Sequence, residues 1–201
     1  NGIVSYWKLD EASGTVIDEL GINNGTNNGS TTSAIGKINT AYDFNVNTDH
    51  INTTNTDLND LENHTVSMWL KRNGNGISYA TLFSNGVINT GISILQEAQT
   101  QNVFYRLTDS AANTDLASTG SELTSEYNHF VFSFNGTDMM IYVNGTLVKS
   151  QSAVLTLDTA AGDYAFIGGI DGIGSFVLYS ESLLLIFNII GIWPGYSDAA
   201  I

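Results

Sequence analysis

Apolar and polar residues alternate over most of the chain. A period of two is typical of β-strands with one buried face, and glycine and asparagine interrupt the alternation as turns do. The pattern predicts strands at residues 3–9, 41–44, 65–71, 80–84, 91–96, 102–108, 129–134, 139–143, 146–150 and 163–167. Helical periodicity is confined to residues 56–63, where Thr56 would cap about two turns.

The clearest local signal lies between residues 129 and 150. Two dipeptides, Asn135-Gly136 and Asn144-Gly145, each separate two alternating apolar runs. Asn-Gly readily adopts the positive φ angles of a type I′ turn, so the segment predicts a three-stranded antiparallel meander. The core-facing side chains of its first two strands are expected to be Phe130, Phe132, Phe134, Met139, Ile141 and Val143.

The longest apolar run covers residues 183–193 and contains Asn188. It is about half as long as a bilayer span, so it predicts a buried strand and no membrane insertion. Many short strands without a helical layer to cover them require sheet to pack on sheet. The predicted fold is therefore all-β, a two-sheet antiparallel β-sandwich or jelly roll, with a single domain over residues 1–201.

Composition narrows the choice of partners. The 201 residues include 20 acidic and 6 basic side chains, which give a net charge of −14, and there is no cysteine. Disulfides and thiolate metal sites are thereby excluded. The negative charge would repel a phosphate backbone, so nucleic acid is not expected as a partner. The acidity and the many small polar residues favour an extracellular, cell-surface or virion-surface location.

Several motifs occur in a recognisable order. Residues 4–15, 41–44, 65–71, 129–145 and 166–169 resemble, in order and spacing, laminin G-like domains of the concanavalin A-like lectin/glucanase superfamily. The resemblance extends over about residues 2–176. It implies a two-sheet antiparallel jelly roll that commonly binds glycans or protein surfaces, often with calcium. It also implies one module of a larger extracellular or phage protein.

Residues 177–201 depart from the family pattern. Family members usually close with a strand that carries an Asp-Glu pair and then an aromatic residue. Here residues 177–192 have Glu181 as their only acidic side chain. A family calcium ligand on that final strand therefore has no counterpart in this chain.

Catalysis is not expected, although the superfamily includes glucanases. A retaining glycosidase needs two carboxyl groups about 5 to 5.5 Å apart, usually at alternate positions of one strand. Here Asp10 and Glu11 are adjacent, as are Asp18 and Glu19, which would place the side chains of each pair on opposite faces of a strand. No nucleophile-elbow serine accompanies the three histidines, His50, His64 and His129.

Calcium is the cofactor that the sequence permits. This hard cation takes six to eight oxygen ligands from carboxylates, side-chain amides and the carbonyls of turns. The candidate ligands are Asp18, Asn23, Asp43, Asp49 and Asp171. Ordinary Asx-turns use the same residue types, so a purely structural role for these side chains stays open.

Sugar binding is the favoured activity. Carbohydrate sites combine an aromatic ring under the C–H face of a pyranose with polar groups that bind the hydroxyls. Most of the 9 Tyr, 9 Phe and 3 Trp must form the core, and Trp7 and Trp69 match core-strand positions of the family. The predicted ligand-binding residues lie in loops or at strand edges: Tyr79, Tyr105, Arg106, Tyr127 and Tyr164.

The sequence thus predicts a non-catalytic binding or adhesion module that recognises surface carbohydrate within a larger extracellular or phage assembly. A net charge of −14 favours a glycan that is neutral or bridged by a cation. The alternative is a structural decoration or spacer domain that acts through protein–protein contacts with neighbouring subunits of the assembly.

Overall fold

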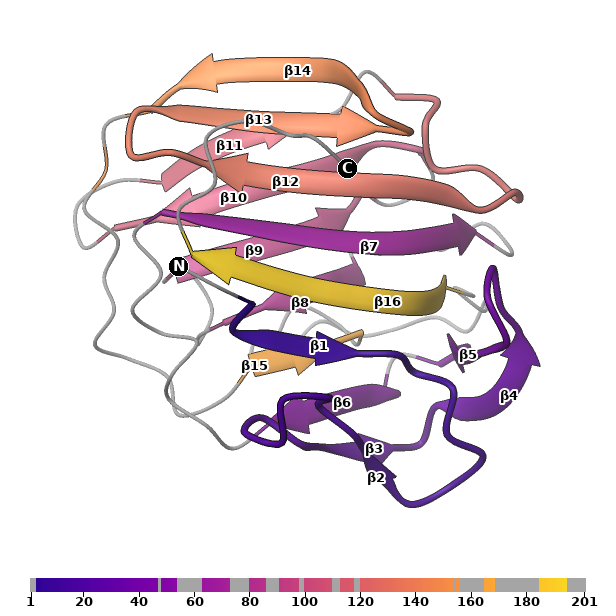
Figure 1. Cartoon of the computed structure of the whole chain (residues 1–201). Coiled ribbons are helices and arrows are strands. Elements are labelled where there is room, and N and C mark those ends of the chain that lie inside the picture. The colour runs from indigo at the N-terminus through magenta and orange to yellow at the C-terminus, as the bar shows by residue number, and fades with distance from the viewer. Residues whose placement is uncertain are drawn as a thin grey trace.

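Two stacked antiparallel sheets form the molecule (Figure 1). The structure is a computed structural model, and it describes residues 3–46, 48–53, 63–72, 80–85, 91–97, 100–109, 113–117, 120–153, 155, 165–168 and 185–194. For residues 113–117 and 185–194 only the backbone is described. Every regular element in these ranges is a strand, and none of them contains a helix that could span a membrane.

The first sheet, sheet A, faces the viewer in Figure 1. Its strands lie in the order β14 (Thr146–Ser152), β13 (Asp138–Val143), β12 (Asn128–Phe134), β7 (His64–Arg72), β16 (Leu185–Pro194), β5 (Thr40–Phe44) and β4 (Thr31–Ile35). The strand β1 (Ser5–Trp7) also pairs with β16. Sheet A therefore joins segments from both ends of the chain at its centre.

The second sheet, sheet B, lies behind sheet A. Its order is β11 (Asn113–Ala117), β10 (Val103–Thr108), β9 (Gly91–Gln96), β8 (Ala80–Ser84), β15 (Ala165–Ile167), β6 (His50–Thr53), β3 (Gly25–Asn28) and β2 (Thr15–Val16). The predicted sandwich is confirmed, and β8 and β9 have the bounds that the alternation predicts.

The space between the sheets is filled by side chains from alternate strand positions. Phe130, Phe132 and Phe134 of β12 are at most 1% exposed, as are Met139 and Ile141 of β13, which confirms the predicted core faces. Trp7 is fully buried as well, and its indole N–H donates to the carbonyl of Asn23 at 2.8 Å. Burying rings of this size provides much of the hydrophobic stabilisation of the fold.

The two Asn-Gly dipeptides form different turns. Asn144 and Gly145 have φ angles of 50° and 80°, as a two-residue type I′ turn between β13 and β14 requires. At the other turn only Gly136 has a positive φ, so the predicted type I′ geometry is wrong there. Instead, Oδ1 of Asn135 accepts hydrogen bonds from the backbone N–H groups of Thr137 and Asp138, as in an Asx-turn.

The long apolar run forms β16, which confirms a strand in that segment. This strand pairs with β7 on one side and with β1 and β5 on the other, and its register with β7 shifts between Phe187 and Ile190. Strands β2, β3, β4, β6 and β11 have no counterpart in the predicted set. Of the predicted helix at 56–63, only Asn63 belongs to the described residues, and it lies in a bend.

Candidate functional site

The predicted ligand-binding residues do not form one site. Tyr79 and Tyr164 lie outside the described residues. Tyr105 is fully buried on the core side of β10, and its hydroxyl hydrogen bonds to Nε2 of His64. Its aromatic ring packs between the sheets because Val103, Tyr105 and Leu107 share the inner face of the strand. The prediction for Tyr105 is therefore corrected, since a core ring cannot present a face to a surface ligand.

Arg106 and Tyr127 lie on opposite sides of the sandwich. Arg106 follows Tyr105 on β10, so its side chain points to the outer face of sheet B. Tyr127 precedes β12, its hydroxyl donates to the carbonyl of Ile35 at 2.8 Å, and Lys71 of β7 lies over its ring. Of the predicted ligand-binding residues that the structure describes, Tyr127 is thus the one that lies beside the outer face of sheet A.

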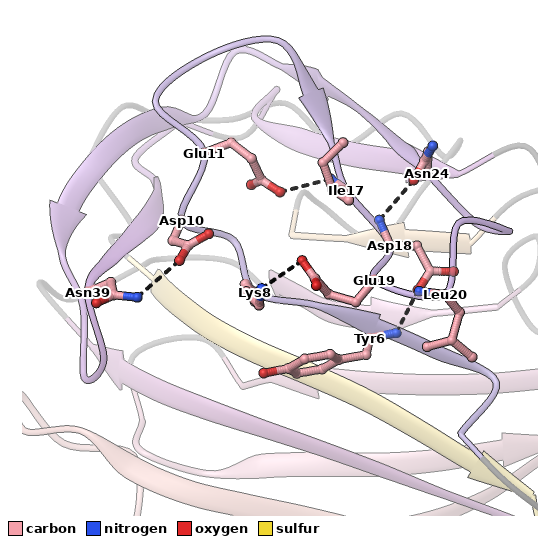
Figure 2. Close-up of polar contacts among 10 residues, drawn as sticks. All are labelled: Tyr6, Lys8, Asp10, Glu11, Ile17, Asp18, Glu19, Leu20, Asn24 and Asn39. Carbon is pink, nitrogen blue, oxygen red and sulfur yellow. Dashed lines mark hydrogen bonds and ion pairs between the residues drawn. The ribbon is translucent and has the colours of Figure 1, made fainter.

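The carboxylate of Asp18 lies in a pocket of donors near the N-terminus (Figure 2). It accepts hydrogen bonds from the backbone N–H groups of Tyr6 at 2.9 Å, Leu20 at 3.2 Å and Asn23 at 2.9 Å, and from the hydroxyl of Ser5 at 3.3 Å. Asp18 is 1% exposed. A cation would have to displace these donors, so Asp18 does not fit the predicted calcium site and serves to hold the loop.

Asn23 shares this pocket. Its side-chain amide donates to the hydroxyl of Ser5, while its own Oδ1 is buried and has no hydrogen-bond partner. One unpaired amide oxygen beside a saturated carboxylate does not provide the several oxygen ligands that calcium requires. In the described part of the chain, moreover, no three acidic or histidine side chains are grouped to hold a metal.

Asp43, within β5, and Asp49, directly before β6, form a second acidic pair. Oδ2 of Asp49 accepts from the backbone N–H groups of Asn45 at 3.0 Å and Val46 at 3.2 Å. Oδ1 of Asp43 is buried and has no partner. Burial, and then the charge of Asp49, raise the pKa of Asp43 to about 6, against the opposing effect of Lys71. This pair fits a cation better than the Asp18 pocket does. The remaining candidate, Asp171, lies outside the described residues.

The outer face of sheet A carries aromatic and basic side chains together. Val66, Met68 and Leu70 of β7 are fully buried, so the intervening Trp69 and Lys71 point outward. We call the group formed with Tyr127, His129 and Lys37 the outer-face cluster. Its members are Trp69, Lys71, Tyr127, His129 and Lys37.

Short contacts hold this cluster in place. The rings of Trp69 and His129 are 5.0 Å apart between centroids, and the Nζ atom of Lys37 lies 5.0 Å from the centre of the Trp69 ring. Nζ of Lys71 lies 5.1 Å from the ring centre of Tyr127. Burial, and then the charge of Asp43, raise the pKa of Tyr127 to about 12, so its phenol stays protonated and can donate a hydrogen bond at neutral pH.

The position of Trp69 differs from the expected core position. It is half-buried on the outer face. The sequence could have indicated this position, because Trp69 alternates with the core residues Met68 and Leu70. The contact with Lys37 could not be read from the sequence, because it depends on how the turn between β4 and β5 folds beside β7.

One pair of side chains resembles a nucleophile and its base. Oγ of Ser67 lies 2.7 Å from Nε2 of His129, within hydrogen-bond distance. Ser67 is 4% exposed, and among the described residues no carboxylate hydrogen bonds to the His129 ring to orient it. The pair therefore joins β7 and β12 across the sheet and lacks the orienting acid of a catalytic triad.

The comparisons agree with this architecture. The sequence profile of the laminin G-type group in the concanavalin A-like lectin/glucanase superfamily matches residues 45–177. That is more than half of the chain, which therefore belongs to this superfamily, as its motifs predict. No curated protein sequence matches the chain significantly.

Several similar solved structures are binding domains of botulinum neurotoxins. The botulinum neurotoxin serotype D binding domain has a TM-score of 0.75 and 19% identity, over 98% of this chain and 49% of that one. The serotype DC binding domain, solved with sialylT, has a TM-score of 0.74 and 13% identity, over 98% and 48%. A type C structure, described by its dependence on two gangliosides, has a TM-score of 0.75 and 13% identity, over 98% and 48%.

The chain spans about half the length of these neurotoxin binding domains. At such low sequence identity, the likeness shows a shared fold and nothing more. The chain is thus a lectin-like jelly roll of the kind found in receptor-binding and carbohydrate-binding domains. The ligands named for the neurotoxins belong to chains twice as long, so they do not by themselves place a sugar on this half.

Proposed function

We propose that this chain is a non-catalytic glycan-binding module and that the glycan binds at the outer-face cluster of sheet A. The observation that carries the proposal is the placement of two partly exposed rings, Trp69 and Tyr127, around the outward-pointing Lys71. Membership of a lectin superfamily and the structural likeness to receptor-binding domains support it.

The cluster offers the groups that a pyranose needs. The C–H face of the sugar would pack on the indole of Trp69, while Lys71 and the His129 ring would bind hydroxyl groups. The exposed Lys37 lies over the indole in the free chain. It would swing aside and donate to the sugar, because an exposed cation–π contact contributes only about 0.5–1 kcal/mol.

Affinity per site is expected to be modest. Each hydroxyl exchanges water for a protein partner, so the net gain is small. Dissociation constants in the millimolar to micromolar range, about −4 to −8 kcal/mol, are expected. Several copies on one extracellular, cell-surface or virion assembly would then supply useful avidity.

A direct test uses the chain coupled to a multivalent carrier and probed on a glycan array. We expect a defined set of glycans to bind, and Trp69→Ala to lower the signal at least tenfold because the stacking surface is removed. Phe104→Ala is the matched control, since Phe104 is a partly exposed ring on the outer face of sheet B. Equal loss in both variants, or no binding by the native chain, would refute the outer-face site.

Calcium is proposed as a structural cofactor at Asp43 and Asp49. The unpartnered Oδ1 of Asp43 and the repulsion between the two carboxylates fit a cation that neutralises both. A bound cation stabilises the native state by mass action.

We expect millimolar calcium to raise the melting temperature, chelator to reverse the rise, and Asp43→Asn to abolish it. Asp138→Asn should retain the rise, because that carboxylate bonds Thr137 and Ser152 instead. Equal melting temperatures with calcium and chelator would leave Asp43 and Asp49 as turn residues.

One observation favours the alternative, a decoration or spacer domain. Ile17, Leu20 and Ile22 are 41%, 39% and 52% exposed within one short segment. Apolar side chains that lie close together on a surface suit contact with a neighbouring subunit. An empty glycan array, together with a packed interface over this segment in the parent assembly, would select this alternative.

A further inference from the structure

At one end of the sandwich, the inner faces of both sheets finish in polar side chains. Arg72 is the last residue of β7 in sheet A, and Gln96 is the last residue of β9 in sheet B. They continue the inward-facing positions of Leu70 and Ile94, and they are only 7% and 1% exposed. Nη1 of Arg72 and Nε2 of Gln96 both donate to the carbonyl of Thr100, so the two side chains converge on one point.

The convergence leaves three buried polar atoms without partners. They are Nε and Nη2 of Arg72 and Oε1 of Gln96. The hydrogens of Nε and Nη2 point from the same edge of the planar guanidinium, which is the fork that binds a carboxylate through two parallel hydrogen bonds. The edge of Arg72 that suits a carboxylate is therefore the one without a partner. Gln96, whose amide meets Arg72 at the Thr100 carbonyl, adds an unpartnered acceptor that suits a hydroxyl.

The neighbouring carboxylates have other roles. Glu97 accepts hydrogen bonds from the hydroxyl of Thr100 at 2.8 Å and from the side chain of Asn102 at 2.6 Å. Glu122 accepts from the backbone N–H groups of Gly120 and Ser121. No carboxylate in the described part of the chain bonds to Arg72, although the whole chain has a net charge of −14. Burying an unpaired cation is unfavourable, and burial lowers the pKa of Arg72 accordingly.

We propose that Arg72 and Gln96 form a binding site for a carboxylate with a neighbouring hydroxyl group, as acidic sugars carry. Nε and Nη2 donate to the two carboxylate oxygens, and Oε1 of Gln96 accepts from the sugar hydroxyl. The inference rests on the proposed glycan-binding function and adds the class of sugar. The site is distinct from the outer-face cluster, because Arg72 points inward where Lys71 points outward.

Two properties of the chain bear on such a ligand. Long-range repulsion by the net charge is screened beyond about 8 Å at physiological ionic strength, so the short-range fork decides whether an acid binds. Both side chains are covered in the free chain, so a ligand reaches them only when this end of the sandwich opens locally. Association is therefore expected to be slow compared with that of an exposed sugar site.

The test titrates the chain with the α-methyl glycoside of N-acetylneuraminic acid and with methyl glucuronide, each beside its neutral methyl ester. Acetate serves as a carboxylate without a hydroxyl. We expect one of the acidic sugars to bind about 10- to 100-fold more tightly than its ester, since a charge-assisted pair is lost in the ester. The preference between the two acids identifies the sugar class. Equal binding of acid and ester, acetate binding as tightly as the acidic sugars, or no binding by any of them, would overturn the proposal.

Two variants separate a ligand site from a structural arginine. Arg72→Met removes the unpaired charge but keeps most of the volume, so it should raise the melting temperature of the free chain by about 2–4 °C and abolish stabilisation by the acidic sugar. Gln96→Met leaves the charge in place and should weaken acid binding about tenfold. A fall in the melting temperature of Arg72→Met with unchanged acid binding in Gln96→Met would show that the pair only holds Thr100.

The outcome is separable from that of the outer-face site. Neutral glycans that bind in a Trp69-dependent way, without any preference for acids, would support the proposed function and refute the Arg72 site. Acid binding that depends on Arg72 and persists in Trp69→Ala would support the Arg72 site, and it would refute the outer-face cluster only if no glycan on the array bound in a Trp69-dependent way.

Discussion

The N-terminal pocket and the sandwich end around Arg72 each bury one charged side chain, and they treat it in opposite ways. The carboxylate of Asp18 accepts hydrogen bonds from three backbone N–H groups and one hydroxyl. The guanidinium of Arg72 donates only to the carbonyl of Thr100 and leaves Nε and Nη2 without partners. Similar burial thus accompanies a saturated charge in one region and an unsaturated one in the other.

The difference separates structural from functional polar groups. A buried charge whose hydrogen bonds are all made within the chain stabilises the fold that supplies the donors. A buried charge with unused donors destabilises the free chain unless a ligand completes it. Replacing Asp18 should therefore weaken the fold, whereas replacing Arg72 by an apolar residue should strengthen it.

The largest effect is expected for Asp18→Ala. The change leaves three backbone N–H groups and the Ser5 hydroxyl buried without an acceptor, which should lower the free energy of unfolding by about 3–5 kcal/mol. Urea unfolding followed by tryptophan fluorescence measures the change. Asp10→Asn is the matched control, because that carboxylate accepts one exposed hydrogen bond from Asn39, and it should change stability by less than about 0.5 kcal/mol. A small effect of Asp18→Ala would remove the distinction between the two regions.

Asp43 is the intermediate case, partly exposed and with one unpartnered oxygen. Because its pKa is raised to about 6 in the folded state, the native chain binds a proton more tightly than the unfolded chain does. Stability from this group is therefore present at low pH and is lost as the pH rises from about 4 through 6. After allowance for solvent screening, we expect a loss of about 1–2 kcal/mol.

Asp43→Asn should remove this dependence and stabilise the chain at pH 7. Urea unfolding at pH 4.5 and 7.0, without calcium, checks both statements. The free energy of unfolding of the native chain, relative to that of Asp43→Asn, should be lower at pH 7.0 than at pH 4.5. An equal or higher value at pH 7.0 would contradict the raised pKa of Asp43. Calcium should flatten the same dependence, because a bound cation favours the ionised carboxylate.

The parts of this molecule that the sequence predicts are those fixed by short-range rules. Period-two alternation locates β8 and β9 with their correct bounds, and Asn144-Gly145 specifies its turn because few residues other than Asn and Gly readily adopt two successive positive φ angles. The turn at Asn135 differs because its side chain can bond the backbone in another way. Strand β2 has two residues, and β3 and β4 consist mostly of Gly, Thr, Asn and Ser, so no apolar alternation marks them.

The candidate sites depend on contacts that no local pattern encodes. Tyr105 belongs to the strand predicted at residues 102–108 and is expected at its edge, yet the packing of the two sheets places it in the core beside His64. Arg72 and Gln96 are 24 positions apart and meet only because β7 and β9 end at the same edge of opposite sheets. The sequence predicts an acidic surface. Which buried polar atoms, such as those of Arg72 and Gln96, are left without hydrogen-bond partners is decided by how the two sheets pack.

The smallest expected effect concerns His129. Like Asp18, this side chain makes its hydrogen bond within the chain, to Ser67. Burial lowers the pKa of His129, so the native chain binds a proton less readily than the unfolded chain. Stability is then lost as the pH falls below about 6.5, opposite in sign to the effect of Asp43. The two effects overlap near pH 6, so unfolding should be measured between pH 7.5 and 5.5 in the Asp43→Asn background, with and without His129→Gln. The glutamine variant should lose the slope, because it keeps a polar partner for Ser67 but cannot titrate. A slope that persists in His129→Gln would assign it to another group, and a His129 pKa above 6.5 by NMR would contradict the burial argument.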